Sequence, residues 1–108
     1  MKNVIALILA GGMLSVSLHA AGDTKAGKVV YDAKCKTCHG ADGAGNAVLA
    51  KTLKITIPDI RTPEVQKVTD DEIKKGIQVG KGDMKPVKGL SDKQIEDVIA
   101  FSRTLLKP

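Results

Sequence analysis

Both cysteines of this 108-residue chain and one of its two histidines lie in one short motif, CKTCH, which spans Cys35 to His39. Two thiols and an imidazole this close together suit three kinds of site: a redox-active dithiol, a zinc site or a point of covalent haem attachment. Each kind needs a different surrounding fold and a different number of further ligands. The motif therefore limits what the chain can fold into more than any other feature of the sequence.

The amino-terminal segment indicates the compartment. Lys2 is followed by an apolar stretch from Val4 to about Leu18, and the small residues Ala20 and Ala21 come after it. This order is typical of a secretory signal peptide. A retained membrane anchor is the alternative, but the stretch is shorter than the ~20 residues of a spanning helix and contains glycines and serines. We expect residues 1–20 to be a signal peptide, cleaved after Ala20 or Ala21, and the mature domain to cover residues 21–108.

The mature domain would keep few residues that can bind a metal or fill a large core. One histidine, His39, and one methionine, Met84, remain after signal removal, and Tyr31 and Phe101 are the only aromatic residues. A domain this small buries only about 60% of its unfolded surface and often needs an additional staple. A large apolar cofactor would supply that staple. Loss of Lys2 lowers the formal charge from +5 to +4, and an exported, weakly basic domain poor in aromatics does not suit nucleic acid.

The clearest helix is predicted near the carboxyl terminus. Ile95, Val98 and Ile99 begin an apolar stripe at helical spacing that continues to Leu106. Ser91 starts the segment, and the glutamine three residues later completes a capping box. A long, well-capped helix is therefore expected at this end of the domain.

Two further helices follow from similar signals. Asp23 is the expected N-cap of a helix from Thr24 to Lys34. Thr69 and Glu72 repeat the capping box before a second helix, which Gly80 ends together with the glycine two residues later. These segments predict an all-α domain.

The segment from Gly40 to Lys67 shows no helical pattern. Only LKITIPD alternates as a strand would, and Pro58 interrupts it. So long an irregular segment is uncommon in a compact domain. We therefore expect it to pack against something other than the predicted helices.

The three interpretations of the CKTCH motif now differ in what they explain. A thioredoxin-like dithiol belongs to a parallel βαβ frame, and no alternating strand and helix pattern surrounds Cys35. A structural zinc site needs four ligands, whereas the mature chain offers three from Cys and His. A disulfide between Cys35 and Cys38 would leave His39 without a role. Haem attachment uses all three residues, because two thiols add to the vinyl groups and the adjacent histidine binds iron.

CKTCH followed by GADGAGN, then MKP, then a capped carboxyl-terminal helix resembles a small class I cytochrome c over nearly the whole mature chain. The resemblance implies an all-α cytochrome c fold, with three or more helices packed around one covalently attached haem c and its iron. Cys35 and Cys38 would attach the haem, and His39 would be the proximal iron ligand. Met84, which follows His39 at the spacing usual in the family, would be the opposite axial ligand.

The resemblance also predicts how other residues contribute. The first and last helices would cross near the haem, with Gly27 against Phe101. The family usually has proline directly after the axial methionine, whereas here Lys85 comes first, which leaves the stiffness of that loop in question. A proline carbonyl often accepts the ring N–H of the proximal histidine, and Pro58 or Pro63 could do so. An arginine in the same segment, at position 61, could face a haem propionate.

With both axial positions occupied, we expect no enzymatic activity, since no residue would act as acid, base or nucleophile. The expected function is a soluble, monomeric electron carrier of the periplasm, without a membrane span in its mature chain. Three lysines, Lys81, Lys85 and Lys88, flank the Met84 loop, and Lys36 lies inside the motif. The expected partners are therefore redox proteins with acidic surfaces, such as an oxidase, reductase or dehydrogenase.

Two alternatives remain at this point. One is a ligand-binding haem sensor or weak peroxidase from which Met84 dissociates readily. The other is a cytochrome subunit of a larger oxidase or dehydrogenase complex.

Overall fold

The computed structural model describes residues 22–107 of the chain, so the expected signal peptide and its cleavage site lie outside the described residues. Within these residues the chain forms six α-helices and, apart from an isolated bridge between Lys81 and Met84, no β-structure. The helices are α1 (Thr24–Lys34), α2 (Lys36–His39), α3 (Ala47–Leu53), α4 (Pro63–Gln66), α5 (Asp70–Val79) and α6 (Asp92–Arg103). None of these helices is long and apolar enough to cross a membrane.

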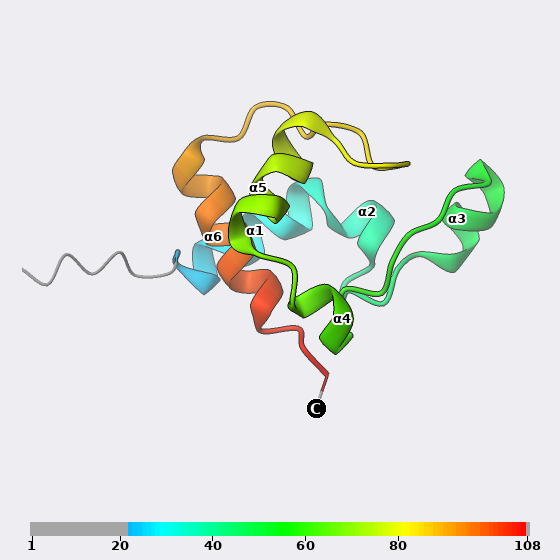
Figure 1. Ribbon diagram of the computed structural model, residues 1–108, viewed down its shortest axis with the longest axis horizontal. Helices are drawn as coiled ribbons and strands as arrows, with labels where there is room; N and C mark the ends of the chain where they lie inside the picture. Colours follow the sequence, from blue (N-terminus) through cyan, green and yellow to red (C-terminus); the bar gives the residue numbers. More distant parts are fainter. Residues whose placement is uncertain (1–21, 108) are drawn as a thin grey trace, which may run out of the picture.

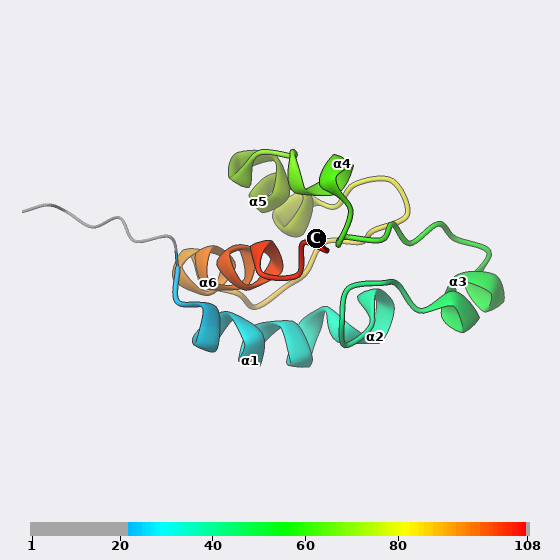
Figure 2. The ribbon, with the colours of Figure 1, turned by 90° about the horizontal axis from the view of Figure 1, so that it is seen from below.

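The first and last helices pack directly on each other, and α5 lies on the other side of α6 (Figures 1 and 2). The buried core joins all three helices: Val30 and Tyr31 from α1, Ile77 from α5, and Ile95, Val98 and Ile99 from α6. The apolar stripe predicted for the last helix is thus the one that is buried. The helix itself ends at Arg103, and Leu106 beyond it is 46% exposed.

Gly27 fixes how closely α1 and α6 approach. A Cβ atom at this position would overlap the backbone carbonyl of Asp97 and would lie 2.9 Å from the Cβ of Phe101. The crossing of Gly27 against Phe101 is therefore confirmed, and only glycine fits there. The glycine costs about 0.5–1 kcal/mol of helix propensity relative to alanine. The close contact of the two helices accounts for its presence.

The predicted helix starts are confirmed, one of them in part. Asp23 caps α1 by accepting the N–H of Lys25 at 2.9 Å. At the start of α6, Ser91 and Gln94 form both bonds of a capping box. At the start of α5, the Thr69 side chain accepts the N–H of Glu72 at 3.2 Å, but the Glu72 side chain forms no bond back, so this capping box is only half formed. Gly80, with φ 83°, ends the helix as predicted.

The segment between α2 and α5 differs from the expectation of an irregular chain. It contains α3, capped by Asn46 through the N–H of Leu49, and α4, capped by Thr62 with Pro63 at its first position. These helices are too short to show an amphipathic period, so only their caps could have revealed them. The alternating LKITIPD stretch is not a strand.

The helix α3 lies at the end of an arm that projects away from the three packed helices (Figures 1 and 2). The side chains of Val48 and Leu53 on it are 77% and 54% exposed. The described polypeptide therefore provides little for this helix to pack against.

Candidate functional site

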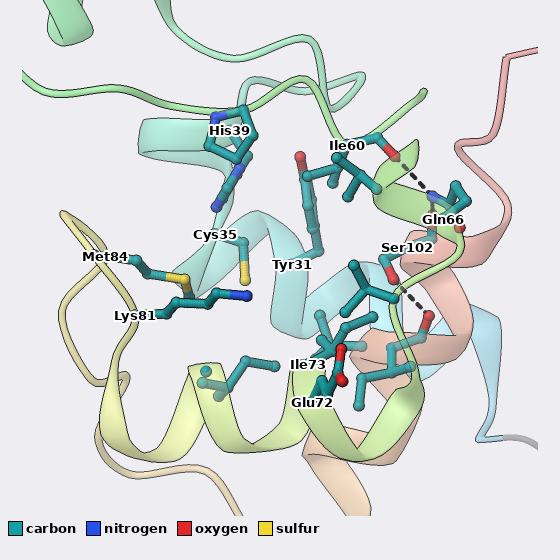
Figure 3. Close-up of a pocket in the computed structure, with 18 of the residues that line it drawn as sticks. Tyr31, Cys35, His39, Ile60, Gln66, Glu72, Ile73, Lys81, Met84 and Ser102 are labelled. Atoms are coloured by element: carbon teal, nitrogen blue, oxygen red, sulfur yellow. Dashed lines mark hydrogen bonds between the residues drawn. The ribbon is translucent and has the colours of Figure 1, made fainter. Parts of the chain in front are cut away.

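A cavity of about 480 Å³ lies between the helices and two loops, residues 54–62 after α3 and residues 80–91 after α5 (Figure 3). Its walls come from α1, α2, α5 and α6, from the segment that joins α3 to α5, and from the loop after α5. Ten of the 21 residues that line it are apolar or aromatic: Tyr31, Pro58, Ile60, Val65, Val68, Ile73, Ile77, Met84, Val98 and Ile99. The cavity is thus suited to a large apolar group.

The CKTCH motif lies where α1 passes into α2. The N–H of Cys35 donates to the carbonyl of Tyr31 at 2.8 Å, and the N–H of His39 donates to the carbonyl of Cys35 at 3.0 Å. This helical turn brings Cys35 and His39 to the same cavity wall. Cys38 is a half-buried free thiol on the same turn and is not among the lining residues.

Met84 reaches the same cavity from the loop between α5 and α6. Its side chain extends from the loop after α5 into the space that Cys35 and His39 border (Figure 3). The residue is half-buried and packs against the core. The structure therefore brings together three of the four residues predicted as haem attachment points and iron ligands.

The loop that carries Met84 is held by its own backbone. Lys81 and Met84 exchange two N–H to carbonyl hydrogen bonds of 2.9 Å across a two-residue turn, with Gly82 at φ 55°. Glycine at the first central position with positive φ is what a type II′ turn requires. A Cβ on Gly80 would lie 2.7 Å from the carbonyl oxygen of Met84, so this approach also requires glycine. The Met84 loop is therefore held by its backbone, although Lys85 and not proline follows the methionine.

Burial controls the protonation of the site. It lowers the pKa of His39, so the imidazole is neutral at physiological pH and has a lone pair for a metal. The pKa of Cys35 is raised to about 11, first by burial and then by the neighbouring Cys38, which keeps it a thiol. The buried Nδ1 of His39 has no hydrogen-bond partner among the described residues. Neither Pro58 nor Pro63 therefore accepts a hydrogen bond from it, although Pro58 lines the cavity.

Tyr31 is a site residue that the sequence analysis did not single out. Its hydroxyl donates to the carbonyl of Gly40, directly after His39, at 2.6 Å. Burial raises its pKa to about 12, and the nearby aspartates, together with Cys35 once it ionises at alkaline pH, add to the shift. The hydroxyl thus stays a donor over the physiological range. Its ring also packs on Phe101, with centroids 5.1 Å apart.

Arg61 does not face the cavity. Its guanidinium pairs with Asp59 at 2.8 Å and with Asp42 at 3.4 Å, and it is not a lining residue. Hydrogen bonds from Arg61 lower the pKa of Asp59 to about 2. Arg103 does line the cavity, and it donates to the carbonyls of Gln66 and Val68 at 2.8 and 2.6 Å. The guanidinium of Arg103 therefore stabilises the turn between α4 and α5.

The set of donors around the cavity fits haem. It combines a thiol that can form a thioether, a half-buried imidazole whose buried Nδ1 has no partner among the described residues, and a thioether sulfur, all on a largely apolar wall. Histidine and methionine together are an axial pair that binds haem iron.

Comparison with known proteins agrees with this arrangement. Residues 22–101 match the family described as cytochrome C oxidase, cbb3-type, subunit III. The chain belongs to this family of c-type cytochromes. Cytochrome c-554(547) of Halothiobacillus neapolitanus is 34% identical over 91 residues, which are 79% of this chain and 99% of that protein.

Solved structures show the same fold. The KustC0563 c-type cytochrome has a TM-score of 0.64 and 30% identity, over 75% of this chain and 98% of that one. A chain of the reducing HAO-like complex Kustc0457/Kustc0458 of Kuenenia stuttgartiensis also has a TM-score of 0.64. At 21% identity, over 80% of this chain and 44% of that one, it shows the fold alone. The predicted all-α cytochrome c fold is confirmed.

Membership of the family also gives the cofactor and the type of reaction. C-type cytochromes contain covalently bound haem c with its iron, and they transfer electrons. They are generally carriers rather than enzymes. This chain is therefore an electron-transfer cytochrome.

Proposed function

We propose that Cys35 and Cys38 attach one haem c through thioether bonds and that His39 and Met84 are its axial ligands. The observation that carries this proposal is the meeting of Cys35, His39 and Met84 at a single apolar cavity. The neutral imidazole and the unpartnered Nδ1 of His39 support it further. No other histidine or methionine of the mature chain could replace these two residues.

The bound haem supplies exchange of a single electron between ferric and ferrous iron. The protein residues determine how readily this happens. The Met84 thioether favours the ferrous form and raises the reduction potential relative to a second histidine. The apolar walls would limit the access of water to a haem held here. With His39 and Met84 both bound to its iron, no position would be left for a substrate. The chain then acts as an electron shuttle and not as an enzyme.

The site of action is proposed to be the periplasm. Residues 1–20 have the order of a signal peptide, with cleavage after Ala20 or Ala21, and the mature cytochrome domain would cover residues 21–108. We expect the mature domain to be a monomer. A gel-filtration profile of the periplasmic fraction would test this expectation.

That profile also tests a second arrangement, favoured by the description of the family as an oxidase subunit. Elution of all the cytochrome with an oxidase or dehydrogenase would identify the chain as a subunit of a larger complex. Elution at the size of the mature domain would support the free shuttle.

The partners are proposed to present acidic surfaces. Four lysines are exposed here: Lys36 inside the motif, and Lys81, Lys85 and Lys88 around Met84. If these charges steer docking, the rate of electron transfer to an acidic partner should fall as salt rises, since screening shortens to ~8 Å at physiological ionic strength. Rates that stay constant from low to high salt would exclude this role.

A pyridine haemochrome spectrum with the intact mass of the periplasmic protein tests haem attachment. We expect one haem per chain that survives acid extraction, and its loss in Cys35→Ala combined with Cys38→Ala. Recovery of the wild-type chain as a folded, haem-free dithiol protein would instead support a redox function for the two cysteines.

A further inference from the structure

One hydrogen bond connects the loop that carries Met84 to the arm that carries α3. The backbone N–H of Thr56, which follows α3, donates to Oδ2 of Asp83 at 3.0 Å. The two residues are 27 positions apart in the sequence, and both line the cavity. The bond therefore joins two segments that are distant in the sequence at the rim of the same cavity.

Each segment is otherwise fastened at its base. The arm is held near its start by bonds from Gly45 N–H to the carbonyl of His39, at 2.7 Å, and from Ile60 N–H to the carbonyl of Gly43, at 3.0 Å. The Met84 loop is fastened to α5 by the bond from Val87 N–H to the carbonyl of Ile77, at 2.8 Å. These bonds hold the base of each segment. The bond from Thr56 joins the part of the arm that returns from α3 to the turn that carries Asp83.

Asp83 also has a special place in its own loop. It is the second central residue of the turn between Lys81 and Met84, directly before the methionine. A force on the Asp83 carboxylate therefore acts on the backbone of Met84 through a single peptide unit. A carboxylate is also a stronger acceptor for an N–H than a neutral oxygen.

We propose that Asp83 is a positioning residue, which fastens the Met84 loop to the arm and so slows the departure of Met84 from the iron. The proposal rests on the proposed ligation by Met84. Without the bond, the loop and the arm separate more often, and an external ligand reaches the iron more often. Asp83 thereby helps to determine whether the protein behaves as a closed electron carrier or as an open, ligand-binding haem protein.

The test uses the ferric holoprotein with imidazole as the external ligand. At saturating imidazole, the rate of binding is limited by the dissociation of Met84. We expect Asp83→Ala to raise this limiting rate about three- to tenfold, the effect of losing one typical intramolecular hydrogen bond. Asp83→Asn keeps an oxygen that can accept from Thr56, so it should restore most of the wild-type rate. Asp71→Ala, which removes another exposed carboxylate, from α5, should leave the rate unchanged.

Hydrogen exchange of the Thr56 amide gives a second measurement that does not depend on the iron. The amide should be protected in the wild type and in Asp71→Ala, and it should exchange faster in Asp83→Ala. An unprotected Thr56 amide in the wild type would overturn the proposal, even if Asp83→Ala could not be purified.

The outcomes separate this proposal from the proposed ligation. If the wild type lacks the weak red absorption of a thioether bound to ferric iron, ligation by Met84 is wrong, and the role of Asp83 fails with it. If the wild type has this band but Asp83→Ala and Asp71→Ala bind imidazole at the same rate, only the role of Asp83 is overturned.

Discussion

The crossing of α1 and α6 and the rim of the cavity are held together in different ways. At the crossing, contacts lie within the polypeptide: Tyr31 and Ile95 are each 2% exposed, and Gly27 allows direct contact between the two backbones. At the rim, the Met84 loop and the arm are joined by the hydrogen bond between Asp83 and Thr56, and α3 exposes apolar side chains to solvent. The first region is complete as a protein core, whereas the second surrounds a space that the polypeptide does not fill.

This difference explains how a small domain can function with few aromatic residues. The packed helices provide a rigid wall with Cys35 at the end of α1, and the loops bring Met84 to the other side of the same cavity. A large apolar group between them would bury surface that the chain alone leaves open. We therefore expect mutations at the crossing to affect folding and mutations at the rim to affect the properties of the haem.

The largest effect is expected for Gly27→Val. The added side chain would overlap the Asp97 carbonyl, and the two backbones cannot separate without disrupting the core. We expect destabilisation of more than about 3 kcal/mol and little accumulation of holoprotein. Ala33→Val places the same residue at an exposed position of α1 and should cost a few tenths of a kcal/mol. Denaturant unfolding and haem yield measure both variants, and near-wild-type stability of Gly27→Val would show that the crossing is not rigid.

Substitution of Met84 should change the haem and leave the helices in place. Met84→His should keep a low-spin spectrum but lower the reduction potential by on the order of 0.1 V or more, within the ~0.8 V range that axial ligands span. Met84→Ala should open the iron, giving high-spin character and rapid binding of cyanide. A buried methionine that only fills the core would instead cost about 2–5 kcal/mol when truncated, with potential and spectrum unchanged.

A redox titration and optical spectra of the wild type and both variants distinguish Met84 as an iron ligand from Met84 as a core residue. Helix content by circular dichroism is the control, since it should not change. A steady potential in both variants would remove Met84 as a ligand. It would also favour a ligand-binding haem protein over an electron carrier.

The contrast between the two regions also separates what the sequence could predict from what it could not. The helices of the packed region were predicted because their caps and apolar stripes are local: Asp23 and Ser91 cap helices whose buried faces repeat at helical spacing. The helices α3 and α4 were missed because so few residues show no period. In that segment the caps Asn46 and Thr62 were the available signals.

The candidate site divides in the same way. The motif and the family resemblance predicted that Cys35, His39 and Met84 would meet, and they line one cavity. The bonds from Tyr31 to Gly40 and from Thr56 to Asp83 were not predicted. Each depends on where tertiary packing puts a backbone group, and no local pattern in the sequence encodes that position.

A smaller effect at the crossing is expected for Asp97. This carboxylate is 6% exposed, and it accepts the N–H of Asp23 at 2.8 Å and a hydrogen bond from Lys93. Asp97→Ala leaves the Asp23 N–H without its partner and should cost about 1–3 kcal/mol in the free energy of unfolding. Glu96→Gln, at an exposed neighbouring position, should change it by less than about 0.5 kcal/mol.

The pH dependence of Asp97 has a definite sign. The hydrogen bond from Lys93, followed by that from the Asp23 N–H, lowers the pKa of Asp97 in the folded protein. Its stabilisation is therefore fully present above the unfolded value of about 4, and it is lost as the pH falls through the lowered folded value. Asp97→Asn should remove this part of the acid-induced loss. An unchanged acid limb in that variant would show that the carboxylate is not stabilised by its partners.

The smallest effect is expected at Tyr31, which connects the two regions. Its ring packs on Phe101 at the crossing, while its hydroxyl donates to the carbonyl of Gly40 beside His39. Tyr31→Phe keeps the ring and removes this bond, so we expect a loss of about 0.5–1.5 kcal/mol with the haem spectrum unchanged. Tyr31→Leu removes the aromatic pair as well and should cost more.

The pH dependence of stability in the wild type and in Tyr31→Phe shows whether the Tyr31 hydroxyl causes the loss. Because burial raises the pKa of Tyr31 to about 12, the wild type should lose stability between pH 10 and 12, where the unfolded chain gives up this proton first. Tyr31→Phe has no proton to lose and should be steadier over that interval. Hydrogen exchange near Gly45 and Asn46, whose amides bond to His39 and Cys38, should increase in Tyr31→Phe while α6 stays protected. Faster exchange in α6 instead would mean that Tyr31 stabilises the crossing alone and does not link it to the site.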